Sequence, residues 1–352
     1  MKVLVITPDI HRLGGVANHY LGLQSQWTLD VDYMYIGKRK DKEWKLETAL
    51  HYISSFFCFA IALKKKKYDV VILNPSLRRF QIKRDSLYIR IAKHLKCKVI
   101  TFIHGFGYDF YEQLKKDPRH FASVYNYSTF IYVLYSDFAF LLKGIGISSP
   151  ILQTTTKVAE EFSDIIQLTS PRRTIGNILF VGRLVKEKGI HESLKVFDAL
   201  FNEQICNELV FCGEGPEKSS ILKFSKDQKL NVICRGTLVG DDLANAYKNA
   251  DVLFLLSHGE GLATCILEAM AFGLVIIATP VGGINDFFED GWMGYLVDKD
   301  DIHNIIEKMV FLAKHPAVVQ RISTYNKYYA KKHFMASAVA KQIEGDIIKY
   351  CS

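Results

Sequence analysis

Residues 251–278, DVLFLLSHGEGLATCILEAMAFGLVIIA, decide the fold class of this chain. The apolar run 251–256 predicts a buried strand, 264–272 predicts a helix, and 275–278 predicts a second buried strand. A strand, a helix and a strand in this order predict parallel pairing through a right-handed crossover. The same alternation occupies residues 177–278, so we expect this half of the chain to form a doubly wound α/β domain.

The first half of the chain has the same alternation of strands and helices. Buried strands are predicted at 2–7, 31–36, 69–74, 98–104 and 130–134. Helices are expected between them, with long ones at 48–66 and 77–96. A polar stretch at 153–174 interrupts the pattern and predicts an interdomain linker, within which a short helix is the alternative to plain coil. We therefore expect two Rossmann-like α/β domains, residues 1–168 and 169–332, with ligands bound in the cleft between them.

Composition and charge agree with two globular domains. The 352 residues are 49 % hydrophobic and 23 % charged, with a formal net charge of +8. Residues 1–170 hold 24 Lys and Arg against 15 Asp and Glu, a net of +9, and the remainder holds 21 against 22, a net of −1. A basic first half attracts nucleic acid, anionic lipid or a phosphorylated substrate; the alternative is a solvated basic surface.

Several classes of protein are not expected. The best candidate for a membrane span, residues 53–63, is far shorter than the ~20 apolar residues that a span needs. The N-terminus is predicted to be a strand and not a signal peptide. Seven cysteines without CxxC spacing predict buried free thiols and a cytoplasmic location. The DxD string Asp30-Val31-Asp32 opens a strand, whereas a metal–nucleotide site belongs at a strand's far end, so no metal site is expected.

Charged residues directly after the predicted strands mark the candidate site. Arg183 follows the strand 177–182, and Lys188 comes just before a helix, so both cations can reach one point beside a diphosphate. Glu260 lies in the loop after 251–256, and Glu268 lies one turn into the next helix among apolar neighbours. A carboxylate buried there needs hydrogen-bond donors, and vicinal ribose hydroxyls would supply two. The alternative is a basic loop and two surface carboxylates.

Three further features carry weaker signals. The helix start at Leu262, Ala263 and Thr264 offers backbone N–H groups to a phosphate. The turn Leu13-Gly14-Gly15 after the first strand lets the backbone approach a ligand closely, although it is not a GxGxxG fingerprint. His104 ends the strand 98–104 and either faces the cleft or is a satisfied structural histidine.

Taken together, the motifs GGV, HG, VGRLVKEKG, CGEGP and EGLATCILEAMAFG resemble family 4 of the retaining glycosyltransferases, strongly over 177–298 and more weakly in the first half. The resemblance implies the GT-B architecture, in which two Rossmann-like domains face each other across a cleft. It also implies that a C-terminal helix, about 333–352, packs back onto the first domain.

The resemblance implies a role for each matching residue. Catalytic roles at the transferred sugar and the departing diphosphate fall to His104, Arg183, Lys188 and Glu260. Glu268 would hold the ribose, and Gly213 and Leu238 would lie at the base pocket. Backbone contacts with sugar and phosphate would come from Gly14, Gly15, Leu262, Ala263 and Thr264. The family needs no metal and no cofactor, since fixed cations neutralise the diphosphate, and a UDP-sugar is the expected donor.

The expected activity is transfer of a hexose-type sugar to a saccharide or lipid-linked saccharide, in surface polysaccharide biosynthesis. The sequence has EGLA where EGFG is commoner, and Asp286 where Glu is frequent, which bears on sugar identity. Rival readings are a nucleotide-sugar 2-epimerase on the same scaffold and a non-catalytic nucleotide-sugar-binding relic. Nucleic-acid binding lacks a motif.

The acceptor side of the sequence suggests a membrane. Basic segments at 64–67 and 78–98, with Phe56, Phe57 and Phe59 nearby, predict peripheral contact with the inner face of the cell membrane. The alternative is that the aromatic side chains belong to the core and the lysines are solvated.

Overall fold

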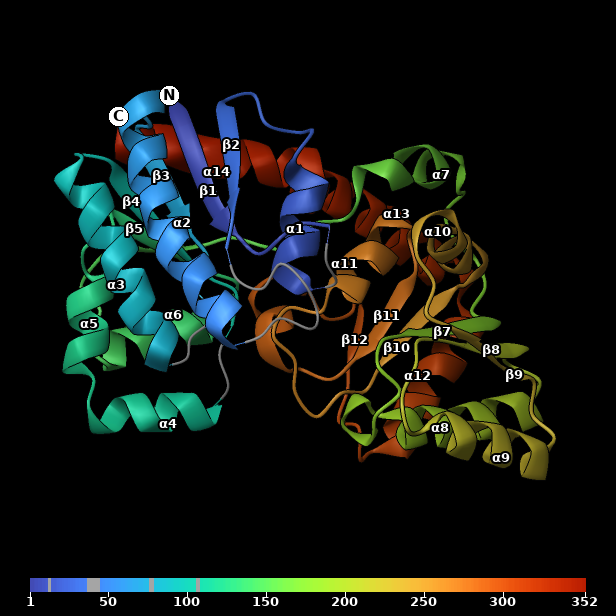
Figure 1. The fold of residues 1–352 in the computed structure, drawn as a ribbon. Helices are drawn as coiled ribbons and strands as arrows, with labels where there is room; N and C mark the ends of the chain where they lie inside the picture. Colours follow the sequence, from blue (N-terminus) through green and yellow to red (C-terminus); the bar gives the residue numbers. More distant parts are fainter. Residues whose placement is uncertain (12–13, 37–44, 76–78, 106–107) are drawn as a thin grey trace. The chain divides into compact units, whose positions relative to one another are not determined.

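The computed structural model describes residues 1–11, 14–36, 45–75, 79–105 and 108–352, with backbone only at 45–52, 79–80 and 108–109. The chain divides into two compact units, Met1–Thr156 with Val339–Ser352, and Lys157–Ala338. We call them unit 1 and unit 2. Each unit is a parallel sheet with helices on its faces (Figure 1).

Unit 1 is built on a six-stranded parallel sheet in the order β2-β1-β3-β4-β5-β6. The strands are β1 (Lys2–Thr7), β2 (Asp30–Tyr35), β3 (Val70–Leu73), β4 (Lys98–Ile103), β5 (Phe130–Val133) and β6 (Ile151–Gln153). The helices are α1 (Gly15–Leu23), α2 (Lys45–Lys66), α3 (Arg79–His94), α4 (Tyr108–Lys116), α5 (Arg119–Tyr125) and α6 (Ser136–Gly144). Every residue of β3 and β5 is buried, because helices cover both faces of the sheet.

Unit 2 has a second six-stranded parallel sheet in the order β12-β11-β10-β7-β8-β9. The strands are β7 (Asn177–Val181), β8 (Glu208–Cys212), β9 (Val232–Gly236), β10 (Val252–Leu255), β11 (Val275–Ala278) and β12 (Gly294–Leu296). The helices are α7 (Ser163–Leu168), α8 (Ile190–Asn202), α9 (Lys218–Gln228), α10 (Gly240–Asn249), α11 (Thr264–Ala271), α12 (Ile302–Lys314) and α13 (Pro316–His333), with 3-10 turns η1 (Glu160–Phe162), η2 (Lys186–Lys188) and η3 (Gly282–Asp286).

The division between the units differs from the expected boundary at residue 168. Residues 157–168 belong to unit 2, because Val158 pairs with Met335 and the buried Phe162 ring packs against Phe272. The polar segment 153–174 is therefore not a plain linker, since it holds η1 and α7.

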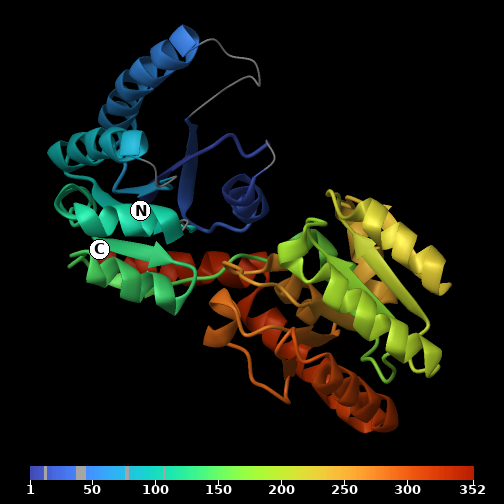
Figure 2. The ribbon, with the colours of Figure 1, turned by 90° about the horizontal axis from the view of Figure 1, so that it is seen from below.

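The last helix, α14 (Ala336–Cys351), returns to unit 1 from Val339 onward. Glu344 accepts hydrogen bonds from the backbone N–H groups of Thr28 and Leu29 at 2.6 and 2.8 Å, and Gln342 donates to the backbone of Gln153. Figure 2 shows the helix running beside β6. The expected packing of the C-terminal helix is thus present, beginning a few residues later than 333.

Strand order locates the ligand edge of each sheet. In unit 2 the chain runs outward from β7 to β9 on one side and from β10 to β12 on the other, so the order reverses between β7 and β10. In unit 1 it reverses between β1 and β3. Ligands of doubly wound sheets bind at the carboxyl ends of the strands beside such a reversal. The segments after β7, β10, β1 and β3 are therefore the places to look.

Candidate active site

Two loops at the reversal point of unit 2 are fastened together by close backbone contacts. Gly189, which ends the turn after β7, has φ +72°, and a Cβ there would lie 2.0 Å from the backbone oxygen of Leu256 after β10. The N–H of His258 donates to the carbonyl of Glu187 at 2.8 Å. Only glycine allows this approach, so Gly189 brings the loop that carries Lys188 against the loop that carries Glu260.

The result is an ion pair between two of the predicted site residues. Nζ of Lys188 lies 2.5 Å from Oε1 of Glu260, and their side chains are 18 % and 11 % exposed. The Ser257 hydroxyl donates to the same carboxylate oxygen at 2.6 Å. Lys188 has three N–H donors, so it can pair with Glu260 and still meet a phosphate oxygen.

Arg183 and Gly213 lie at the same edge of the sheet. Arg183 follows β7 and its side chain is exposed, with no ion-pair partner among the described residues. Gly213 follows β8, and a Cβ there would lie 1.8 Å from the carbonyl oxygen of Gly182. This glycine lets the two strand ends approach closely. Leu238 follows β9, and the cavity of about 370 Å³ that it lines extends along α10 to Asn177 and Glu208 at the amino ends of β7 and β8, away from this edge.

The second glutamate of the pair sits in a different environment. Tyr247 of α10 donates its hydroxyl hydrogen to Oε2 of Glu268 at 2.7 Å. Burial raises the pKa of Glu268 to about 7, although the Tyr247 hydrogen bond and the charge of Lys157 oppose the shift. Burial also lowers the pKa of Lys157, against the attraction of Glu268. Burial therefore destabilises the ionised form of Glu268, and further hydrogen bonds from hydroxyl donors would offset that penalty.

The backbone at Gly282 packs against the loop that leads into the helix between the two glutamates. α11 begins at Thr264 after the N-cap residue Ala263, whose carbonyl accepts a hydrogen bond from the N–H of Ile266 at 3.0 Å. Leu262, Ala263 and Glu260 line a small cavity. Gly282 packs so closely beneath the loop that a Cβ would lie 2.2 Å from the carbonyl oxygen of Glu260.

Unit 1 contributes a polar cluster at its own reversal point. Asn74, directly after β3, donates from Nδ2 to the carbonyl of Ile6 at 2.9 Å, which fixes the orientation of its amide. Its Oδ1 lies 3.0 Å from the Tyr20 hydroxyl and 2.9 Å from Nε2 of His104. Since this oxygen can only accept, both neighbours must donate.

The histidine is therefore held as one tautomer. With Nε2 protonated, Nδ1 of His104 keeps its lone pair and is an acceptor. The ring stacks on Phe102 with centroids 3.7 Å apart, and His19 lies 5.5 Å away. Burial, with a smaller effect of His19, lowers the pKa of His104 well below its ordinary value, so the ring is neutral at pH 7. The helix α1, which carries His19 and Tyr20, begins at Gly15 after the N-cap residue Gly14. A Cβ at either glycine would meet no atom within 4 Å. Leu13 lies outside the described residues.

Each unit thus assembles its own share of the predicted residues at one edge of its sheet. Three hydrogen-bond partners of these residues were not predicted from the sequence: Ser257 for Glu260, Tyr247 for Glu268 and Asn74 for His104. The last could have been found, because DVVILN places a polar residue directly after a buried strand.

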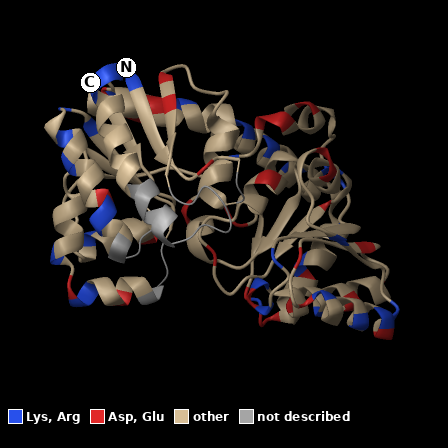
Figure 3. Ribbon diagram, viewed as in Figure 1, with Lys and Arg blue, Asp and Glu red and all other residues tan. Residues whose placement is uncertain are grey.

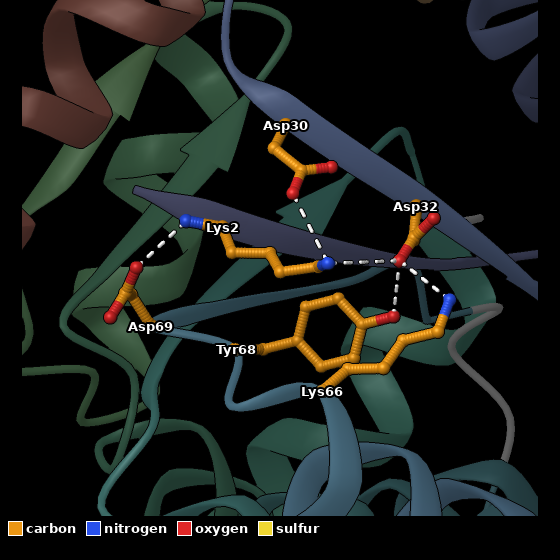
Figure 4. A network of polar contacts seen from close by, with 6 residues as sticks. All are labelled: Lys2, Asp30, Asp32, Lys66, Tyr68 and Asp69. Carbon is orange, nitrogen blue, oxygen red and sulfur yellow. Dashed lines mark hydrogen bonds and ion pairs between the residues drawn. The ribbon is translucent and has the colours of Figure 1, made fainter.

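The Asp30-Val31-Asp32 string lies at the opposite edge of the unit 1 sheet, where β2 begins. Figure 4 shows its carboxylates among lysines: Lys2 lies 3.1 Å from Asp30, and Lys66 lies 3.0 Å from Asp32. The Tyr68 hydroxyl donates to Asp32 at 2.5 Å, and this bond and Lys66 hold the pKa of Asp32 below its usual range. Asp32 thus holds the end of α2 against the sheet through Lys66, whereas Asp30 pairs with Lys2 of β1 within the sheet.

Comparison with known proteins finds a matching family model and several relatives. Residues 172–329 match the family described as glycosyl transferases group 1. Sulfoquinovosyl transferase SQD2 of Arabidopsis thaliana is 30 % identical over 135 residues, 38 % of this chain and 25 % of the relative. The capsular polysaccharide biosynthesis glycosyltransferase CapM of Staphylococcus aureus is 27 % identical over 168 residues, 47 % of this chain and 44 % of the relative. The chain thus spans less than half the length of these relatives.

Solved structures resemble the whole chain. Anabaena Alr3699/HepE in complex with UDP has a TM-score of 0.73 at 12 % identity, covering 99 % of this chain and all of that one. Sucrose-phosphate synthase from Thermosynechococcus elongatus has a TM-score of 0.70 at 17 % identity, covering 99 % and 98 %. The fold is that of the GT-B glycosyltransferases. More particularly, the part of the chain that matches glycosyl transferases group 1, residues 172–329, lies within unit 2.

Proposed function

We propose that this chain is a retaining glycosyltransferase of family 4 that moves a hexose-type sugar from a UDP-sugar to a saccharide or lipid-linked saccharide. The observation that carries the proposal is the placement of Lys188 and Glu260 in contact at the reversal point of unit 2, with Glu268 in the helix that follows. Supporting it, the HepE structures hold UDP and UDP-glucose, and relatives such as CapM are named for polysaccharide biosynthesis.

The donor's nucleotide would bind to unit 2. Two ribose hydroxyls would donate to Glu268, whose raised pKa reflects a carboxylate short of donors. The diphosphate would lie at the start of α11, the positive end of the helix dipole, with Arg183 and Lys188 as its cations. These two fixed charges take the place that a metal ion holds in other nucleotide-sugar sites.

The transfer step then follows from the charges. The bond between the anomeric carbon and the phosphate oxygen breaks, and negative charge grows on the departing diphosphate beside Arg183 and Lys188. The acceptor oxygen bonds to the anomeric carbon on the same face, and its proton passes to the departing phosphate oxygen. Glu260, fixed by Lys188 and Ser257, would orient the sugar ring. His104 would accept a hydrogen bond from a sugar hydroxyl through Nδ1.

Donor binding tests the proposal. Saturation-transfer NMR against UDP-, GDP-, ADP- and CMP-sugars, with a chelator present, should give a signal for one base that Glu268→Ala abolishes. Glu203→Ala, at an exposed position after α8, is the matched control. Binding followed by a change at sugar C2 without an acceptor would instead indicate an epimerase, and binding without turnover on any acceptor would indicate a relic.

A further inference from the structure

The outward face of α2 is an exposed apolar stripe. Ile53, Phe57 and Ile61 are 54, 67 and 52 % exposed. They are spaced four residues apart, so they lie one above another on a single side of the helix. Neighbouring exposed apolar side chains on one surface mark interaction sites more often than chance placement does.

The opposite side of the same helix is anchored in the core. Phe59 and Leu63 are buried, and the Phe56 ring packs on Tyr88 of α3 with centroids 4.6 Å apart. The hydroxyls of Ser55 and Tyr88 are hydrogen-bonded at 2.7 Å. The aromatic side chains therefore divide: Phe56 and Phe59 belong to the core, and Phe57 belongs to the surface. The expectation that all three serve a membrane is corrected accordingly.

Cations continue the stripe. Lys64 and Lys65 are exposed and follow Ile61 by three and four residues, so they lie on the same side of the helix. The neighbouring Lys66 is instead held against the sheet by Asp32 (Figure 4). From residue 53 to 67 the chain has no acidic residue.

The adjacent helix α3 also carries cations, and Figure 3 shows Lys and Arg in blue along it. Arg90 is exposed. Lys83 lines a cavity with residues of α4, and Lys93 lies over the Tyr127 ring after α5, so these two lysines lie on the side of α3 that faces α4 and α5. Its acidic residue, Asp85, is buried and paired with Arg84 at 2.8 Å. Figures 1 and 2 both show α2 and α3 lying side by side. The α2–α3 face, defined as Ile53, Phe57, Ile61, Lys64, Lys65 and Arg90, thus combines an apolar line with exposed cations.

We propose that the α2–α3 face docks on an anionic lipid bilayer, with Ile53, Phe57 and Ile61 inserted among the acyl chains and the lysines and arginine at the headgroups. Apolar side chains flanked by cations are the pattern that holds a helix in the membrane interface. A nucleic acid would neutralise the cations but would leave the apolar stripe of Ile53, Phe57 and Ile61 exposed to water. A second copy of the chain would place basic helix against basic helix, which like-charge repulsion disfavours.

The inference goes beyond the proposed function, because vesicle binding needs neither donor nor acceptor. It would bring a lipid-linked acceptor to the enzyme. It also has a built-in reporter: Cys58, next to Phe57, is exposed, whereas the other six cysteines are buried or half-buried.

The experiment is co-sedimentation with phosphatidylcholine vesicles that contain or lack phosphatidylglycerol. The wild-type chain should bind the anionic vesicles, and the triple variant Ile53→Ser, Phe57→Ser, Ile61→Ser should bind at least ten-fold more weakly. Phe140→Ser, which removes a 77 % exposed ring from α6, should bind as the wild type does. Unchanged donor binding and thermal unfolding of the triple variant will show that it is folded.

Charge and insertion are tested separately. Lys64→Gln with Lys65→Gln should weaken binding and reduce its salt dependence, whereas Lys223→Gln with Lys226→Gln, on α9 of unit 2, should leave both unchanged. A polarity-sensitive fluorophore on Cys58 should shift to the blue on anionic vesicles. Equal binding of the triple variant and the wild type, absence of wild-type binding, or a stripe variant that instead abolishes a dimer would overturn the proposal.

Discussion

Replacing Glu268 by Gln should stabilise the protein while weakening its hold on the donor. The carboxylate sits between Tyr247 and Lys157, and burial raises its pKa from 4.5 to about 7. Above pH 7 the folded protein therefore carries a charge that burial penalises. A glutamine keeps the shape and can still accept from Tyr247, but has no charge to bury.

The magnitude follows from the shift. A rise from 4.5 to about 7, at about 1.4 kcal/mol per pH unit, corresponds to about 3 kcal/mol. Glu268 is only half-buried, so roughly 2 kcal/mol is expected in practice. The folded wild-type protein holds the Glu268 proton more tightly than the unfolded chain does. The protonated carboxyl therefore contributes its full stability below pH 4.5, and this contribution is lost as the pH rises to about 7. The advantage of the variant should therefore grow between these values and stay constant above them.

Urea unfolding of both proteins at a series of pH values measures the difference directly. At pH 8 the free energy of unfolding of Glu268→Gln should be about 2 kcal/mol higher than that of the wild type. At pH 4.5 the two free energies should converge. Its affinity for the donor should fall by about ten-fold or more, since a neutral amide is a weaker acceptor for ribose hydroxyls. A stability difference that does not change with pH, or a variant less stable at pH 8, would refute this reading of Glu268.

Three further substitutions test other parts of the site. Lys188→Ala should lower turnover by about 100–1000-fold, as loss of one charge-stabilising group does, while Lys186→Ala in the same turn changes it little; steady-state kinetics will decide. Gly189→Ala should cost roughly 2–4 kcal/mol in chemical denaturation, because its Cβ would meet a backbone oxygen at 2.0 Å; a neutral effect would contradict the loop contact. Asn74→Asp should raise the pKa of His104 in an NMR titration, because a carboxylate favours the imidazolium; an unchanged titration would show that Asn74 does not set its protonation.

Much of the fold could be predicted because buried parallel strands are uninterrupted apolar runs. The runs at 251–256 and 275–278 are β10 and β11, and the charged residues after such runs lie at the sheet's carboxyl edge. Lys188 and Glu260 could therefore be predicted from the sequence as candidates at this edge. The contact between them depends on Gly189, whose role as a spacer the sequence does not display.

Other features of the fold and the site could not be predicted from the sequence, because they depend on tertiary packing. The segment 153–174 is polar, so nothing local indicates that Phe162 enters the core of unit 2. Tyr247 lies 21 residues before Glu268, and only tertiary packing brings their side chains together. A run such as ISSFFCFAIAL is apolar on all sides, and the structure alone distinguishes the buried Phe59 from the exposed Phe57.

Among the described helices, none is long and apolar enough to cross a membrane. Among the described residues, no three His, Cys, Asp or Glu side chains are grouped closely enough to hold a metal ion. All seven cysteines are free thiols, as their spacing predicted, although Cys58 is exposed rather than buried. Metal independence itself stays a prediction, which turnover in the presence of a chelator will test.

The most direct test of the central claim follows the donor's anomeric carbon. A UDP-hexose labelled with carbon-13 at C1, incubated with saccharide and lipid-linked acceptors and a chelator, is monitored by NMR. The account predicts release of UDP together with a new glycosidic signal of the same anomeric configuration as the donor, and loss of both in Lys188→Ala. A product of inverted configuration, or UDP release that survives in Lys188→Ala at the wild-type rate, would contradict it.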